Sequence, residues 1–293
     1  MSQQLLVEPV FDFADKEQQA FAILDRAVDE YGPEAVCIAI SGGNDSVVAG
    51  RIVSKHPATS HALLIDTQTG VQEGQDWTRA LVAGWGLDLM VRRSPVSFED
   101  LAARYGMLGR GHHRVYFNAL KGRVFEAVAT ELAPKPAQRM VYVSGARRQE
   151  SANRKRNVIP VRHDQHQQRI VWAAPILDWS VLECRAYLCH EGIEPNPVAQ
   201  LLHRSGECNC PAYGTPEELK ELRFWFPDAA AKLDSAMAVA RANGKWDRWG
   251  EPVPAWFGMS EIGGLDDYLA PTCEPEACRD CPSRSNVADG GQG

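Results

Sequence analysis

A short run of glycine and serine follows an apolar stretch early in the chain. Residues 36–40, Val-Cys-Ile-Ala-Ile, have the character of a strand buried on both faces, and a helix is predicted over residues 45–55. A strand-to-helix junction collects unpaired backbone N–H groups and the positive end of a helix, which together attract an anion. The junction therefore predicts a phosphate-binding loop, made of Ser41, Gly42, Gly43, Asn44, Asp45 and Ser46.

The residue types in this loop suit that chemistry. Gly42 and Gly43 allow positive φ and a close approach of the anion to the backbone, and Ser41 and Ser46 add hydroxyl donors. Asp45 is either a helix cap or a group near Mg²⁺. The loop lacks the Gly-Lys-Ser/Thr of the Walker loop and the G-x-G-x-x-G dinucleotide fingerprint. Its S-G-G-x-D-S pattern resembles the signature of the PP-loop pyrophosphatases.

A second set of reactive residues lies in the last third of the chain. Cys208 and Cys210 form one short-spaced pair, and Cys278 and Cys281 form another. Four thiolates are enough for tetrahedral zinc or a [4Fe–4S] cluster, and spacing alone does not choose between these metals. Cys273 is either a free, reactive thiol or a replacement for one member of the four.

The other three cysteines have a simpler interpretation. Cys37 falls within a predicted strand, and Cys184 and Cys189 fall within a predicted helix. We expect all three to be small buried hydrophobic residues.

The predicted elements place these groups together. Strands are predicted over residues 36–40, 61–66, 87–92, 139–145 and 169–174, and helices over 15–31, 45–55, 74–84, 113–132 and 180–190. The last of these helices is predicted to begin with a capping box of Ser180 and Glu183. This alternation implies a doubly wound, mostly parallel α/β sheet, whose ligands bind beyond the carboxyl ends of the strands. The glycine-rich loop, Asp66, Gly145 and the basic run 147–156 all follow strands directly. We therefore expect them to converge at one edge of the sheet.

Composition limits the class of protein. With 293 residues and 44% hydrophobic content, the chain can form one large domain with a small appendage. We predict a nucleotide-binding domain over 1–205 and a helical, cysteine-rich segment over 206–293. The net charge of −7 argues against general attraction to nucleic acid. No apolar run reaches the roughly 18 residues of a membrane span, so a cytoplasmic location without membrane partners is expected.

The order of these motifs resembles the phosphoadenosine phosphosulfate (PAPS) reductase-like branch of the PP-loop, or adenine nucleotide alpha hydrolase-like, superfamily. The resemblance covers roughly residues 30–215. Beyond the glycine-rich loop it rests on the strand end at Asp66 and Thr67, on 175–180 (Pro-Ile-Leu-Asp-Trp-Ser) and on Pro-Asn-Pro at 195–197. It also rests on a G-x-R-x-x-E-S…R stretch, which holds the anionic end of the nucleotide in relatives and corresponds here to Gly145, Arg147, Arg148, Glu150, Ser151 and Arg154.

The resemblance implies a Rossmann-like fold, an adenine nucleotide (ATP, PAPS or APS) and, beside it, an iron–sulfur cluster held by the four paired cysteines, with zinc as the alternative. Two departures disfavour sulfonucleotide reduction by the usual cysteine route. The chain has no Glu-Cys-Gly-Leu-His segment, and Asn44 stands where many relatives have lysine. Residues 105–123 resemble PAPS reductase-like proteins associated with DNA phosphorothioation and phage genomes. There, His113 either binds an anion or caps a helix, and Lys121 is a further candidate.

These observations predict an enzyme that catalyses adenylyl or pyrophosphatase chemistry at the α-phosphate of ATP or a sulfonucleotide, linked to sulfur transfer and to nucleic-acid modification. Asp45, Arg147, Arg148, Arg154, Lys121 and His113 are its candidate catalytic residues. The alternatives are a sulfonucleotide reductase and, from another class, a non-catalytic nucleotide-sensing subunit of a DNA-modification or defence assembly. A cysteine desulfurase or another sulfur donor, a DNA-modification partner and a second copy of the chain are the expected partners.

Overall fold

The computed structural model describes residues 11–164, 167–254 and 257. Its centre is a six-stranded sheet in the order β3-β2-β1-β4-β6-β5. The strands are β1 (Ala35–Ile40), β2 (Thr59–Asp66), β3 (Asp88–Arg93), β4 (Met140–Val143), β5 (Val161–His163) and β6 (Ile170–Ala173). All neighbours pair in parallel except β5, which runs antiparallel to β6 at the edge. The predicted doubly wound, mostly parallel sheet is confirmed.

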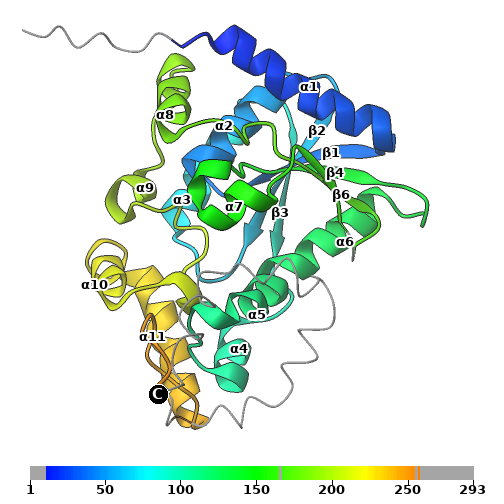
Figure 1. Cartoon of the computed structure of the whole chain (residues 1–293). Coiled ribbons are helices and arrows are strands. Elements are labelled where there is room, and N and C mark those ends of the chain that lie inside the picture. Colours follow the sequence, from blue (N-terminus) through cyan, green and yellow to red (C-terminus); the bar gives the residue numbers. More distant parts are fainter. Residues whose placement is uncertain (1–10, 165–166, 255–256, 258–293) are drawn as a thin grey trace, which may run out of the picture.

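Helices cover both faces of this sheet (Figure 1). On one face lie α1 (Phe13–Tyr31), α2 (Asn44–Val53), α3 (Gln72–Ala83) and α8 (Val181–His190), and on the other lies α6 (Arg123–Leu132). Successive side chains of a strand point to opposite faces. Ile38 and Ile40 accordingly pack under α2, whereas Cys37 packs under α6.

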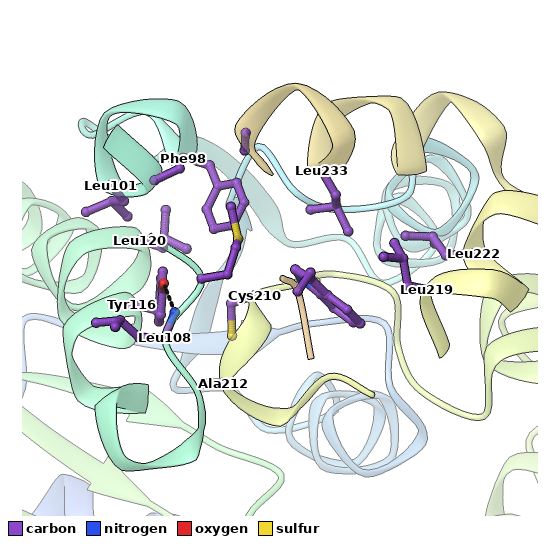
Figure 2. Close-up of a cluster of buried hydrophobic side chains, with 14 of the residues drawn as sticks. Phe98, Leu101, Leu108, Tyr116, Leu120, Cys210, Ala212, Leu219, Leu222 and Leu233 are labelled. Atoms are coloured by element: carbon purple, nitrogen blue, oxygen red, sulfur yellow. Dashed lines mark hydrogen bonds between the residues drawn. The ribbon is translucent and has the colours of Figure 1, made fainter. Parts of the chain in front are cut away.

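A third group of helices builds a separate apolar cluster beside the sheet. It contains α4 (Phe98–Tyr105), α5 (His113–Phe117), α9 (Pro197–Leu202), α10 (Pro216–Trp225) and α11 (Pro227–Ala242). Figure 2 shows Tyr116, Leu120 and Phe98 facing Cys210 and Leu233 across this cluster. The cluster thus contains residues from both sides of the domain boundary predicted near residue 205. The division of the chain into two domains at that point stays a prediction.

The structure corrects the predicted elements at several points. The long helix predicted over 113–132 is divided by a π-helical turn, Asn118–Gly122, between α5 and α6. Strand β5 and the short helices α4, α7 (Ala152–Asn157) and α9 were not predicted, because each is too short to show a clear period. Cys37 and Cys184 are buried as predicted.

The prediction for Cys189 was wrong, because its side chain is exposed. Five residues after Cys184 on the same helix, it is turned about 140° away from the buried face.

Helix α8 illustrates a local prediction that is confirmed in detail. The hydroxyl of Ser180 accepts the N–H of Glu183 at 3.1 Å, and the Glu183 carboxylate accepts the N–H of Ser180 at 2.6 Å. This is the capping box predicted at the start of the helix. No helix in the described part of the chain is long and apolar enough to cross a membrane.

Candidate functional site

The predicted phosphate loop closes on itself between β1 and α2. The hydroxyl of Ser46 accepts the N–H of Ser41 at 3.2 Å and donates to the carbonyl of Gly43 at 2.8 Å. The two serine hydroxyls lie 3.1 Å apart. Helix α2 then begins at Asn44, so its first N–H groups and its positive end face the same point.

Two glycines are required for this geometry. Gly42 has a φ of +75°, and a Cβ placed there would lie 2.4 Å from the Thr78 hydroxyl. At Gly145, which follows β4, a Cβ would lie 2.5 Å from the backbone nitrogen of Ser46. Real Cβ contacts are longer than this, so the loop after β4 and the start of α2 pack together only because residue 145 has no side chain.

The loop opens into a cavity of about 640 Å³ at the carboxyl ends of the strands. Ten of the predicted site residues line it, namely Ser41, Gly43, Asn44, Asp45, Ser46, Lys121, Gly145, Arg147, Glu150 and Arg154. Residues that were not predicted to belong to the site complete the lining, among them Leu63, Ile65, Phe117, Phe125, Trp172, Cys184, Arg185, His203, Arg204 and Glu207. The cavity therefore has an apolar wall on the sheet and a charged wall near the loop.

Arg147 and Asp45 form an ion pair beneath the loop. Arg147 Nε lies 2.9 Å from Asp45 Oδ1, although its N–H is not aligned for a hydrogen bond, and the guanidinium is almost fully buried. Its Nη1 donates to the Trp179 carbonyl at 3.3 Å. Because Arg147 already neutralises Asp45, this carboxylate is a poor fit to the predicted Mg²⁺ site.

Lys121 enters the cavity from the π-helical turn. Its ammonium group lies 2.5 Å from the carboxylate of Glu207, and Glu207 is 7% exposed. Burial opposes the lysine charge, but Glu207 and the thiols of Cys208 and Cys210 outweigh it and raise the pKa of Lys121. The contact with Glu207 therefore favours the charged form of Lys121 in the cavity.

The remaining residues of the basic run separate into two groups. Arg154 pairs with Glu150 at the cavity, and Ser151 caps α7 by accepting the N–H of Arg154 at 3.1 Å. Arg148 instead pairs with Asp178, outside the cavity lining. Part of the basic run 147–156 therefore belongs to the site, whereas Arg148 does not.

Three other predicted residues lie near the cavity without lining it. Asp66 accepts the N–H of Gln68 at 2.8 Å, and the buried Thr67 hydroxyl donates to the Glu207 carbonyl at 2.7 Å. The ring of His113 packs on Tyr213 at 4.6 Å, and burial lowers the pKa of the imidazole. A neutral imidazole offers an anion at most a hydrogen bond.

Cys208 and Cys210 lie next to each other on the loop that follows α9. A hydrogen bond from Cys210 lowers the pKa of the Cys208 thiol well below its ordinary range, and Lys121 acts in the same direction. The Thr69 hydroxyl also donates to Cys208 Sγ at 3.8 Å. The predicted partners Cys278 and Cys281, like Cys273, lie outside the described residues.

The two described thiols suit half of a metal site. Thiolate character is what a metal requires of cysteine, and the hydrogen bond between the two thiols lowers the pKa of Cys208 while it raises the pKa of Cys210. Within the described residues, no group of three or more His, Cys, Asp or Glu side chains is arranged around a metal position. The described pair therefore fits a metal only if further ligands come from elsewhere.

Sequence reasoning missed two residues that organise the site, Glu207 and Asn196. Glu207 precedes Cys208, but its partner Lys121 is 86 positions away, so no local pattern reveals the pair. Asn196 belongs to the Pro-Asn-Pro motif, and its amide donates to the carbonyl of Gly42 at 3.0 Å. The motif was the available signal, but its contact with the phosphate loop was not predictable from spacing.

The fold and this loop define an α/β protein with a PP-loop at the switch point of its sheet. The phosphoadenosine phosphosulfate reductase domain family matches residues 35–212. The chain belongs to this family.

Comparisons with other proteins are more distant. A search of curated proteins finds no match. A phosphoadenylyl-sulfate reductase from Candida auris is 18% identical, with 69% of this chain and 92% of that chain covered and a TM-score of 0.46. An FMN adenylyltransferase from Candida glabrata is 13% identical, with 64% and 59% covered and a TM-score of 0.47. The U34-tRNA thiolase NcsA from Methanococcus maripaludis, with its [4Fe-4S] cluster, is 13% identical, with 79% and 78% covered and a TM-score of 0.42.

Proposed function

We propose that this protein is a PP-loop enzyme that binds ATP or a sulfonucleotide and directs displacement at the α-phosphorus, linked to sulfur transfer. The observation that carries the proposal is the placement of the 41–46 loop. It lines a cavity of about 640 Å³ that also contains Lys121 and Arg154. Membership of the PAPS reductase domain family supports the same substrate class.

The two walls of the cavity match the two parts of a nucleotide. Leu63, Ile65, Phe125 and Trp172 offer an apolar surface that suits a purine ring. The N–H groups at the start of α2 and the hydroxyl of Ser46 suit phosphate oxygens. A nucleotide lying across the cavity would thus place its phosphates between the loop and the cations.

The chemistry is a displacement with ATP as substrate. An acceptor oxygen forms a bond to the α-phosphorus while the bond from that phosphorus to the bridging oxygen breaks, and pyrophosphate leaves with the bond electrons. A thiolate sulfur then attacks the acceptor atom that bears the adenylated oxygen. The bond between that atom and the oxygen breaks, and AMP leaves with the bond electrons. The protein contributes positioning and charge stabilisation. Lys121 and Arg154 are each paired with a glutamate, so they would act by offering their remaining N–H donors to the phosphate oxygens.

A metal at the cysteines belongs to the same proposal. Cys208 and Cys210, together with Cys278 and Cys281, would hold a [4Fe–4S] cluster, with zinc as the alternative. When bound, the cluster would relay sulfur or electrons, or brace the fold. Iron and sulfide analysis of anaerobically purified protein tests this point, because one zinc per chain without iron would exclude an electron relay.

Two other functions compete with this one. A sulfonucleotide reductase would release sulfite from PAPS or APS and would use Cys273 or a partner's thiol as its reductant. A nucleotide-sensing subunit of a DNA-modification or defence assembly would bind ATP without turning it over. The family match keeps the reductase as the principal alternative, and no described contact favours the sensor.

The decisive experiment compares three reactions of the purified protein. ATP binding by calorimetry, pyrophosphate release with candidate acceptors such as tRNA or DNA, and sulfite release from PAPS or APS are measured side by side. Pyrophosphate release supports the proposal, sulfite release supports the reductase, and binding without either product supports the sensor. Absence of any nucleotide binding overturns all three.

A matched pair of variants ties the result to the loop. In Gly43→Val the new side chain would occupy the approach to the loop, because a Cβ added at residue 43 would lie 3.3 Å from Ser205 Cβ. In Gly109→Val the new Cβ meets nothing within 4 Å. We expect the first variant to lose nucleotide binding while staying folded and the second to bind like the wild type.

A further inference from the structure

Asn196 is a buried residue whose amide connects three parts of the molecule. Its side chain is 0% exposed. Its Oδ1 accepts the N–H of Val198 at 2.9 Å and so caps α9. Its Nδ2 donates to the carbonyl of Gly42 at 3.0 Å and lies 3.5 Å from that of Ser205. An N–H donor on one side and carbonyl acceptors on the other leave only this orientation of the amide.

The contact with Gly42 determines which way one peptide group of the phosphate loop points. In a trans peptide the C=O and the following N–H point in opposite directions. Because Asn196 holds the Gly42 carbonyl, the N–H of Gly43 is directed away from Asn196 and toward the Ser41 hydroxyl, to which it makes a long hydrogen bond of 3.5 Å, and both residues line the cavity. A flipped peptide would instead turn a carbonyl oxygen toward an incoming phosphate.

The contact with Ser205 brings a second loop into the same arrangement. Residues 203–210, here called the Cys-bearing loop, contain Cys208 and Cys210. Its backbone at Ser205 lies against Asn196, and Ser205 Cβ lies 3.3 Å from the position of a Cβ on Gly43. One amide group thus sets the phosphate loop and the Cys-bearing loop relative to each other.

We propose that Asn196 is a positioning residue that holds the Gly42–Gly43 peptide in its anion-binding orientation and couples the phosphate loop to the Cys-bearing loop. This inference rests on the proposed nucleotide site, because it assigns the cause of that site's geometry. It does not require any particular reaction.

The test uses Asn196→Asp and Asn196→Ser in the full chain. Both residues retain an acceptor that caps α9. The aspartate carboxylate has no N–H to donate, and the serine hydroxyl is one bond shorter than the amide and so loses the 3.0 Å contact with the Gly42 carbonyl. The serine variant adds no charge, so it remains informative if the buried aspartate prevents folding. We expect both variants to raise the Kd for ATP at least tenfold and to speed amide exchange over residues 42–47 in the ligand-free protein.

Gln68→Glu is the matched control. The Gln68 amide also donates to two carbonyls, those of Ser94 and Val96 at 3.1 and 3.0 Å, and it does not line the cavity. We expect this variant to lose thermal stability while its Kd for ATP and its exchange over 42–47 stay as in the wild type. If Asn196 had a purely structural role, its own variants would likewise lose thermal stability without any change in the Kd for ATP or in exchange over 42–47.

The two readouts separate this inference from the proposed function. If the wild type binds no ATP, the proposed function fails, whereas faster exchange over 42–47 in the Asn196 variants still supports the positioning role. If ATP binds and both variants keep wild-type affinity and exchange, the positioning role is overturned and the nucleotide site stands.

Discussion

The phosphate loop and the Cys-bearing loop lie against each other but are held in different ways. Within the phosphate loop, Ser41, Gly43 and Ser46 bond to one another over at most five positions, and the Gly42 carbonyl also has a distant side-chain partner, Asn196. The Cys-bearing loop is fixed by the residues after β2. The Thr67 hydroxyl donates to the Glu207 carbonyl, and the N–H of Val71 donates to the Gly206 carbonyl at 2.8 Å.

This difference has a physical consequence. Local contacts close small loops and require little of the rest of the chain, whereas contacts over 140 positions form only after the sheet and helices have assembled. We therefore expect the phosphate loop to be disturbed by substitutions among its own residues or of its distant partner Asn196. The Cys-bearing loop should lose its conformation whenever one of its distant hydrogen-bond partners after β2 is removed.

The largest expected effect on ATP binding comes from Gly42→Ala. The positive φ and the 2.4 Å contact with the Thr78 hydroxyl leave no room for a Cβ, so the loop must rearrange. Strain at such a position costs about 1–3 kcal/mol. We expect ATP binding to fall below detection by calorimetry and the free energy of unfolding to drop by about that amount. Retained affinity would show that the loop shape does not matter for binding.

The second prediction concerns the Lys121–Glu207 pair, which joins the Cys-bearing loop to the cavity. Removing one partner of a buried pair leaves an uncompensated charge and costs about 3–5 kcal/mol. Lys121 retains some contact with the cavity, so we expect Lys121→Met to cost about 3 kcal/mol, at the lower end of that range. Urea denaturation measures the loss.

The double variant Lys121→Met with Glu207→Gln provides the internal control. It removes both charges, so it should recover part of the stability that either single change loses. Strictly additive losses would mean that the two side chains do not interact in solution.

Sequence patterns predicted the features that depend on local contacts but missed the contacts between residues far apart in the chain. The strand, the Gly42–Gly43 turn and the start of α2 follow from residue types within ten positions, as does the capping box at Ser180. The partner of Lys121 and the contact of Asn196 depend on how the chain folds back. The π-helical turn was missed because five residues of altered winding barely change an apolar period.

The third prediction tests the anchors of the Cys-bearing loop directly. Thr69 is fully buried, and its hydroxyl accepts the N–H of Asn209 at 3.0 Å. In Thr69→Val that N–H loses its partner, which costs about 1–3 kcal/mol. We expect faster amide exchange over 203–210 and a change of at most about twofold in the Kd for ATP, because the Asn196 contact remains. A tenfold loss of ATP affinity would show that the two loops are not separable in this way.

The last contrast is between two arginines that are six positions apart, and it includes the smallest expected effect, that of Arg148. Arg154 lines the cavity, so Arg154→Ala should weaken ATP binding by about 1.5–3 kcal/mol if it contacts a phosphate. Arg148 pairs with Asp178 outside the cavity lining. Such partly exposed pairs contribute about 0–1 kcal/mol to stability, so Arg148→Ala should leave the Kd for ATP unchanged and lower the free energy of unfolding only slightly.

Calorimetry on both variants at two salt concentrations measures this contrast. The Arg154 contribution should shrink as salt rises, because part of that side chain is solvated and its attraction to phosphate is screened. Equal losses of ATP affinity in the two variants would mean that the basic run attracts the nucleotide through its total positive charge and not through a specific contact. A loss confined to Arg154 would place the nucleotide on the cavity side of the run, because Arg148 carries the same charge but faces Asp178.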